Sequence, residues 1–208
     1  MPLPPWSAAA LGSAFLMWSV MMAVMMLPSA TPMIRAVASA NRRAVAEGAA
    51  ATPVALFVAG YLLAWTGFSA IATILQATLR SLALLTNTLS VNDHRLGGAI
   101  LILAGVWQFT PWKGSYLNHC GNPLSFILLH WREGPGGAIA MGLRHGFDCV
   151  ACCWALMLVL FVVGVMNLWW VATLAVVILF EKLALGGPMV PRIAGVGLVL
   201  WGVVVMVG

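Results

Sequence analysis

Residues 149–180, CVACCWALMLVLFVVGVMNLWWVATLAVVILF, carry no charged side chain. Four more stretches share this property, namely 1–34, 48–79, 96–112 and 193–208. Uncharged apolar runs of about 18 residues or more are candidate transmembrane helices, because the hydrocarbon core of a bilayer is about 30 Å thick. The chain of 208 residues is 62% hydrophobic and 7% charged, whereas soluble domains are about 25% charged. The sequence therefore predicts a polytopic membrane protein and excludes a soluble enzyme, a secreted disulfide scaffold and a disordered chain.

The expected fold is all-α, with one integral membrane domain over residues 1–208 that forms a bundle of about six transmembrane helices. The spans are expected at residues 8–27, 53–79, 97–112, 137–166, 168–185 and 188–207. Pro28 and Pro32 are expected to bend or end the first span. The apolar stretch Leu124–Trp131 is too short to cross a bilayer, so it is interpreted as an interfacial or re-entrant piece.

The ten Lys and Arg residues predict an orientation for this bundle. Eight of them fall on one side of the predicted spans: Arg35, Arg42, Arg43, Lys113, Arg132, Arg144, Lys182 and Arg192. Only Arg80 and Arg95 fall on the other side. The positive-inside rule places the eight-cation side in the cytoplasm and both termini outside. Because the cations are dispersed among apolar runs, no nucleic-acid partner is expected. The first span has no preceding Lys or Arg and is expected to be retained rather than cleaved as a signal peptide.

The stretch that carries metal chemistry is RHGFDCVACCW at residues 144–154, where three of the four cysteines of the chain fall within five residues. Helical periodicity places four of its side chains on one face, with Cys153 beside them. These four are His145, Asp148, Cys149 and Cys152. Thiolates with an imidazole favour a soft transition metal over Mg²⁺ or Ca²⁺. We predict a metal site here, with copper favoured and zinc or iron as alternatives. Its expected ligands are His145, Cys149, Cys152 and Cys153.

One helix cannot surround a metal ion, so further ligands are expected from another segment. His119 and Cys120 lie in a segment predicted on the same side of the membrane, which makes them candidate supplementary ligands. Asp148 and Met157 are weaker candidates. An ion pair with Arg144, four residues earlier, is the alternative explanation for Asp148, and apolar packing is the alternative for Met157.

The first predicted span contains a stripe of methionines. Met17, Met21 and Met25 recur at every fourth position and share one helix face. Thioethers are soft ligands that suit Cu(I), so the stripe is a candidate secondary path for copper. The alternative is structural, because methionine is an adaptable gap filler in apolar packing.

An ordered series of motifs resembles a known family. The series comprises MMLP at 25–28, WQFTPWK at 107–113, His119-Cys120 followed by Pro123, GLRHGFDCVACCWALM at 142–157, GVMNL at 164–168 and Glu181-Lys182. It is similar to a bacterial family of uncharacterised integral membrane proteins described as predicted metal-binding. The resemblance covers nearly the whole chain and is most specific in the Cys-Cys-Trp segment. It implies a membrane location and metal binding. The family pattern has a small residue before the first cysteine, where this chain has Asp148.

The favoured interpretation is a six-span protein of the bacterial inner membrane that binds copper and takes part in metal handling or delivery. A non-enzymatic role is favoured, with an enzymatic one left open. The expected partners are the lipid bilayer and either a metal chaperone or other membrane subunits. One alternative is a membrane thiol–disulfide oxidoreductase, because Cys149 and Cys152 have the Cys-x-x-Cys spacing, although a thioredoxin-like βαβ pattern is absent. The other alternative is a structural or assembly subunit in which the cysteines only pack.

Overall fold

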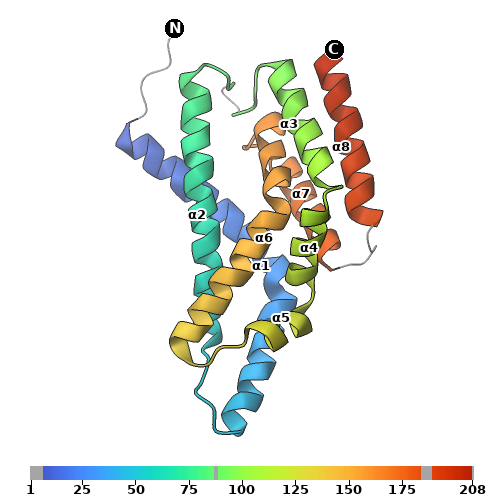
Figure 1. The fold of residues 1–208 in the computed structure, drawn as a ribbon. Helices are drawn as coiled ribbons and strands as arrows, with labels where there is room; N and C mark the ends of the chain where they lie inside the picture. The colour runs from blue at the N-terminus through green and yellow to red at the C-terminus, as the bar shows by residue number, and fades with distance from the viewer. Residues whose placement is uncertain (1–6, 87–88, 184–188, 208) are drawn as a thin grey trace.

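The structure is a computed structural model that describes residues 7–86, 89–183 and 189–207. Within these ranges the chain forms eight α-helices and no strand, which confirms the all-α prediction for the described part. In chain order the helices are α1 (Ala8–Ala46), α2 (Val54–Ser81), α3 (His94–Trp107), α4 (Pro111–Gly121), α5 (Pro123–His130), α6 (Gly134–Val163), α7 (Leu168–Lys182) and α8 (Met189–Val207). Figure 1 shows a bundle in which α6 runs through the middle, and α6 packs against α2, α3, α4 and α7.

Four of these helices, α1, α2, α6 and α8, are long and apolar enough to cross a membrane. The third and fifth predicted spans correspond to α3 and α7, which have 14 and 15 residues. At 1.5 Å per residue these two are each only about 20 Å long, shorter than a hydrocarbon core of about 30 Å. The structure therefore supports four spans by length, and the total of six spans with both termini outside stays a prediction.

Helix α1 continues well beyond the predicted end of the first span at residue 27. It runs to Ala46 and contains Pro28 and Pro32 in its interior. A proline inside a helix removes one backbone hydrogen bond and clashes with the preceding turn, so it kinks the helix without necessarily ending it. Figure 1 shows α1 changing direction along its length, which agrees with bending rather than termination.

The third predicted span, residues 97–112, is wrong as one continuous helix. Helix α3 ends at Trp107, and α4, which the sequence did not predict, begins at Pro111 after a short break. The hydroxyl of Thr110 accepts a hydrogen bond from the backbone N–H of Lys113, and Pro111 occupies the first turn, which are both helix-starting features. The short apolar piece predicted at 124–131 is α5. The predicted span limits at 185 and 188 lie outside the described residues.

Small residues let α2 and α6 approach closely. A Cβ atom added to Gly146 would lie 2.6 Å from the Cβ of Ala64 and 2.9 Å from the carbonyl oxygen of Tyr61. An added Cβ on Gly142 would contact the carbonyl oxygen of Phe57 even more closely. Glycines four residues apart are a common contact between apolar helices, because they allow backbones to meet. This contact brings the aromatic side chains of α2 against the middle of α6.

Candidate metal centre

Three side chains from two helices bring potential metal ligands together in the bundle interior. The ligand atoms of Cys120 on α4 and of His145 and Cys149 on α6 all lie within 4.8 Å of one another, and all three residues are buried. The Sγ of Cys120 lies 3.0 Å from the Sγ of Cys149. His145 and Cys149 are four residues apart and therefore share a helix face, while Cys120 approaches from α4. Two sulfur atoms and one imidazole nitrogen form a donor set suited to a soft metal ion.

The His145 ring is held by aromatic side chains. It stacks on Phe57 and Tyr61 with ring centroids 5.9 and 5.6 Å apart, and Phe126 meets it edge-on at 5.4 Å. Its Nδ1 is buried without a hydrogen-bond partner among the described residues. A buried polar atom without a partner costs about 1–3 kcal/mol. An imidazole that aromatic rings hold in place, and that has a ring nitrogen close to two thiols, fits a metal-binding role.

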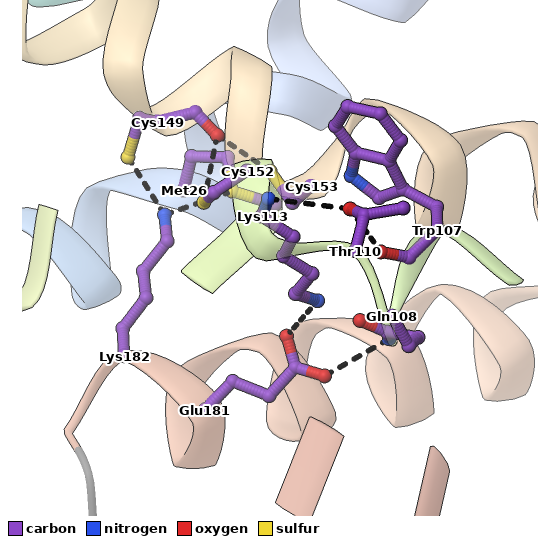
Figure 2. Close-up of polar contacts among 10 residues, drawn as sticks. All are labelled: Met26, Trp107, Gln108, Thr110, Lys113, Cys149, Cys152, Cys153, Glu181 and Lys182. Carbon is purple, nitrogen blue, oxygen red and sulfur yellow. Dashed lines mark hydrogen bonds and ion pairs between the residues drawn. The ribbon is translucent and has the colours of Figure 1, made fainter. Parts of the chain in front are cut away.

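A lysine from α7 reaches the same sulfur atom. The Nζ of Lys182 lies 2.7 Å from the Sγ of Cys149 and 3.0 Å from the Oγ of Ser29, and the Sδ of Met26 is 4.0 Å away. Figure 2 shows Lys182 pointing from the end of α7 toward Cys149 and Met26. The residue is 4% exposed, and no carboxylate in the described ranges lies within ion-pairing distance of it. Its ammonium group is therefore held next to the candidate ligands rather than next to an acid.

The hydroxyl group of Tyr61 completes the surroundings of the Cys149 sulfur. It lies 3.4 Å from the Sγ of Cys149 and donates a hydrogen bond of 3.2 Å to the carbonyl oxygen of Met26. Since Tyr61 also stacks on His145, one side chain of α2 contacts both ligands that α6 supplies. The close packing of α2 and α6 thereby fixes the positions of two of the three candidate ligands.

A buried ion pair lies beside this group. The Nζ of Lys113 on α4 lies 2.6 Å from a carboxylate oxygen of Glu181 on α7, and the amide nitrogen of Gln108 donates to the other oxygen at 3.0 Å (Figure 2). Lys113 belongs to the helix that carries Cys120, and Glu181 directly precedes Lys182 in the chain. The ion pair therefore joins the helix that supplies one ligand to the helix that supplies the ammonium group.

Two cavities border the centre. The larger, of about 650 Å³, is lined by residues of α4, the end of α7 and the start of α8, among them Lys113, Glu181, Lys182 and Arg192. The smaller, of about 200 Å³, is lined by Ser29, Met33, Cys120 and Lys182 among others. Lys182 therefore faces both cavities, and Cys120 is reached from the smaller one.

The structure separates the predicted cysteine cluster into two groups. Cys149 joins Cys120 and His145, whereas Cys152 and Cys153 lie outside this three-residue group. The thiols of Cys152 and Cys153 are buried and donate to the carbonyl oxygen of Cys149, at 3.1 and 2.9 Å. The bond within one turn gives Cys153 a local structural role, whereas the thiol of Cys152 also forms a hydrogen bond with the thiol of Cys120. Their predicted role as metal ligands stays a prediction.

The other predicted site residues lie around the three-residue group rather than in it. His119 is half-buried, and Met157 is fully buried in the main apolar core. Asp148 is 3% exposed and pairs with Arg144, whose Nε lies 3.7 Å from its carboxylate, as the alternative interpretation expected. None of these three belongs to the group that could hold an ion.

The methionine stripe lies along the core, and a neighbouring methionine lies at the centre. Met25 is buried, while Met17 and Met21 are partly buried against the same core cluster. The methionine near Lys182 is Met26, which flanks the predicted stripe on α1. The sequence pattern indicated no site role for Tyr61 or Lys182. Glu181 and Lys182 follow an uncharged apolar run, which is typical of the end of a span. A lysine that points into the bundle at this position gives the same pattern.

The fold and the buried Cys/His group define a class of protein. An all-α chain with long apolar helices and a buried set of two thiols and one imidazole is suited to handling a soft metal ion. A sequence model of the PpoB2 copper chaperone family matches residues 15–205, and the chain therefore belongs to that family. No curated protein and no solved structure matches the chain. Family membership and the Cys/His group together support copper handling.

Proposed function

We propose that this protein is a membrane-embedded copper chaperone that binds Cu(I) through Cys120, His145 and Cys149 and passes it to an acceptor protein. The observation that carries the proposal is the convergence of three ligand atoms within 4.8 Å from α4 and α6. Soft thiolates suit Cu(I), and zinc and iron–sulfur centres are the competing species for the same donors. Membership of a copper chaperone family points to the same metal.

Helical spacing predicts Cys149, Cys152 and Cys153 as sulfur ligands, whereas the structure groups Cys149 with Cys120. Cys149 is the cysteine that both ligand sets share. The difference can be tested with single serine variants of the full-length protein, purified in detergent under anaerobic conditions and loaded with Cu(I). We expect Cys120→Ser and Cys149→Ser to lose copper, and Cys153→Ser to keep the copper content of the wild type. Copper per protein after gel filtration is the measurement, with zinc measured in the same samples.

Equal copper in all variants and in the wild type would show that these thiols do not hold the metal. Loss of copper in Cys153→Ser but not in Cys120→Ser would instead favour the cluster within α6 over the group that joins two helices. Because Cys153 is as buried as Cys149, its serine variant is a matched control for the general effect of placing a hydroxyl in this core.

We place the protein in the bacterial inner membrane, with both termini outside and the metal centre reached from the cytoplasmic side. Four long apolar helices support a membrane location, and the distribution of Lys and Arg supports the orientation. Reporter fusions that are active on only one side of the membrane test it at each terminus. Two cytoplasmic termini would overturn the orientation but would leave the metal site unaffected.

A further inference from the structure

The ammonium group of Lys182 lies beside a candidate metal ligand, and copper binding alone does not explain why. Its ammonium group lies 2.7 Å from the Sγ of Cys149, which is one of the three candidate ligands. A metal ion bound to that sulfur and to the neighbouring ligands needs the space around the same atom. The lysine and the metal therefore compete for one position beside Cys149.

The charge of the lysine suits such a competition. A buried ion is costly unless another group compensates it, and the partners of the Lys182 ammonium are a thiol sulfur, a hydroxyl oxygen and a thioether sulfur. Both an ammonium group and Cu(I) carry a single positive charge, so Cu(I) can replace the positive charge that the ammonium group places beside Cys149. Thiols bind a metal as thiolates, so any proton on Cys120 or Cys149 leaves to solvent as Cu(I) enters. The displaced ammonium group needs another polar environment nearby.

Such an environment adjoins the residue. The cavity of about 650 Å³ is lined by Lys182 itself, by the carboxylate-bearing Glu181 and by the amides Asn118 and Asn122. The side-chain oxygen of Gln108, which also lines this cavity, is buried without a hydrogen-bond partner among the described residues. A lysine has a flexible four-carbon stem, so its ammonium group can change position while its backbone stays in α7.

We propose that Lys182 is a displaceable cation that regulates the affinity and release of copper. In the metal-free protein its ammonium group occupies the position beside Cys149. When Cu(I) binds, the side chain moves into the larger cavity, and its return lowers the cost of releasing the metal to an acceptor. This inference rests on the proposed function, and it assigns Lys182 a positioning role rather than a role as ligand.

The test compares full-length protein with the variants Lys182→Leu and Lys182→Arg by competition for Cu(I) with a chromophoric chelator. Leucine removes the competing charge and, unlike methionine, adds no soft donor for Cu(I). We expect Lys182→Leu to bind Cu(I) more tightly and release it more slowly, by about tenfold, which corresponds to about 1.4 kcal/mol. Lys182→Arg keeps the charge and should remain much closer to the wild type in both quantities.

A second variant and a second measurement keep the test decisive. Ser29→Ala removes one hydrogen bond that holds the ammonium group, so it should raise Cu(I) affinity in the same direction by a smaller factor. Copper loading should also increase the acetylation of Lys182 by a water-soluble reagent, because the amine moves to a cavity. If Lys182→Leu does not fold, as judged by its thermal unfolding, the Cu(I) affinity of Ser29→Ala decides between the outcomes.

The outcomes separate the two proposals. A wild-type protein that binds no Cu(I) overturns the proposed function and this inference together. A wild type that binds Cu(I), with a folded Lys182→Leu variant of equal or weaker affinity, overturns the displaceable cation alone. Equal or weaker affinity in Ser29→Ala has the same meaning when Lys182→Leu is unfolded. Weaker binding would mean that the ammonium group stays beside the occupied site and stabilises it.

Discussion

The ammonium group of Lys113 on α4 lies 2.6 Å from the carboxylate of Glu181 on α7, and the two side chains are only 1% and 2% exposed. This contact joins two helices that are far apart in the sequence. Cys120 lies on the same helix as Lys113, and Lys182 is the residue after Glu181. A buried ion pair therefore sets the distance between the helix that carries a candidate sulfur ligand and the helix that carries the ammonium group.

Removing one partner of this pair should destabilise the protein strongly. In Glu181→Leu the Lys113 ammonium is left buried without a counter-charge, which costs about 3–5 kcal/mol in comparable sites. The double variant Lys113→Met/Glu181→Leu removes both charges and should recover most of the loss, because buried ion pairs are often replaced by apolar groups at little cost. Unfolding in detergent with increasing denaturant measures both. A single variant as stable as the wild type would contradict the role assigned to the pair.

The contact between α2 and α6 predicts an asymmetry between two glycines of α6. In Gly142→Ala the new Cβ meets the backbone of Phe57, and overpacking of this kind costs about 1–3 kcal/mol. Gly136→Ala is the matched control, because an added Cβ there meets no atom within 4 Å. Thermal unfolding should show a clear loss for Gly142→Ala and little change for Gly136→Ala. Similar stability of both variants would mean that the helices separate without penalty.

The long apolar helices could be predicted because their signal is local. The span expected at 53–79 is α2 (Val54–Ser81), and the one expected at 137–166 is α6 (Gly134–Val163). Uncharged runs of this length have few other stable conformations. The helix α4 was missed because it is short and polar, so neither its length nor its hydropathy distinguishes it from a loop. Only Thr110 and Pro111 mark its start.

Part of the candidate site could also be predicted, because the spacing of residues along one helix is a local signal. Helical spacing correctly puts His145 and Cys149 on one face, because four residues make about one turn. Spacing cannot show which thiols turn back to their own helix, as Cys152 and Cys153 do. It also cannot show which distant residue completes the group, because the contact between Cys120 and Cys149 depends on the packing of α4 against α6.

The methionines of α1 predict different effects at and away from the centre. Met26 lies beside Lys182, so its thioether is near any ion that replaces the ammonium group at Cys149. We expect Met26→Leu to weaken Cu(I) binding severalfold, because it removes a soft donor with little change in volume. The triple Leu variant of Met17, Met21 and Met25 should keep the equilibrium affinity and change, at most, the rate of loading. Chelator competition and stopped-flow loading measure the two quantities, and unchanged affinity in Met26→Leu would exclude its thioether as a donor.

The two adjacent sulfur atoms predict a specific response to oxidation. The Sγ atoms of Cys120 and Cys149 are 3.0 Å apart, and a disulfide bond of about 2.05 Å needs only a small further approach. Diamide should oxidise these two thiols to one disulfide, with both protons and both electrons transferred to the diamide. Peptide mapping by mass spectrometry should find Cys120 joined to Cys149, and bound Cu(I) should protect both.

The serine variants give this experiment its controls. Cys153→Ser should form the same bond as the wild type, whereas Cys120→Ser should not. A bond between Cys149 and Cys152 in the wild type would contradict the arrangement of the thiols described above and would revive the Cys-x-x-Cys pair as a redox centre. Because a disulfide consumes two of the three candidate ligands, oxidised wild-type protein should also fail to bind Cu(I), and a thiol reductant should restore the binding.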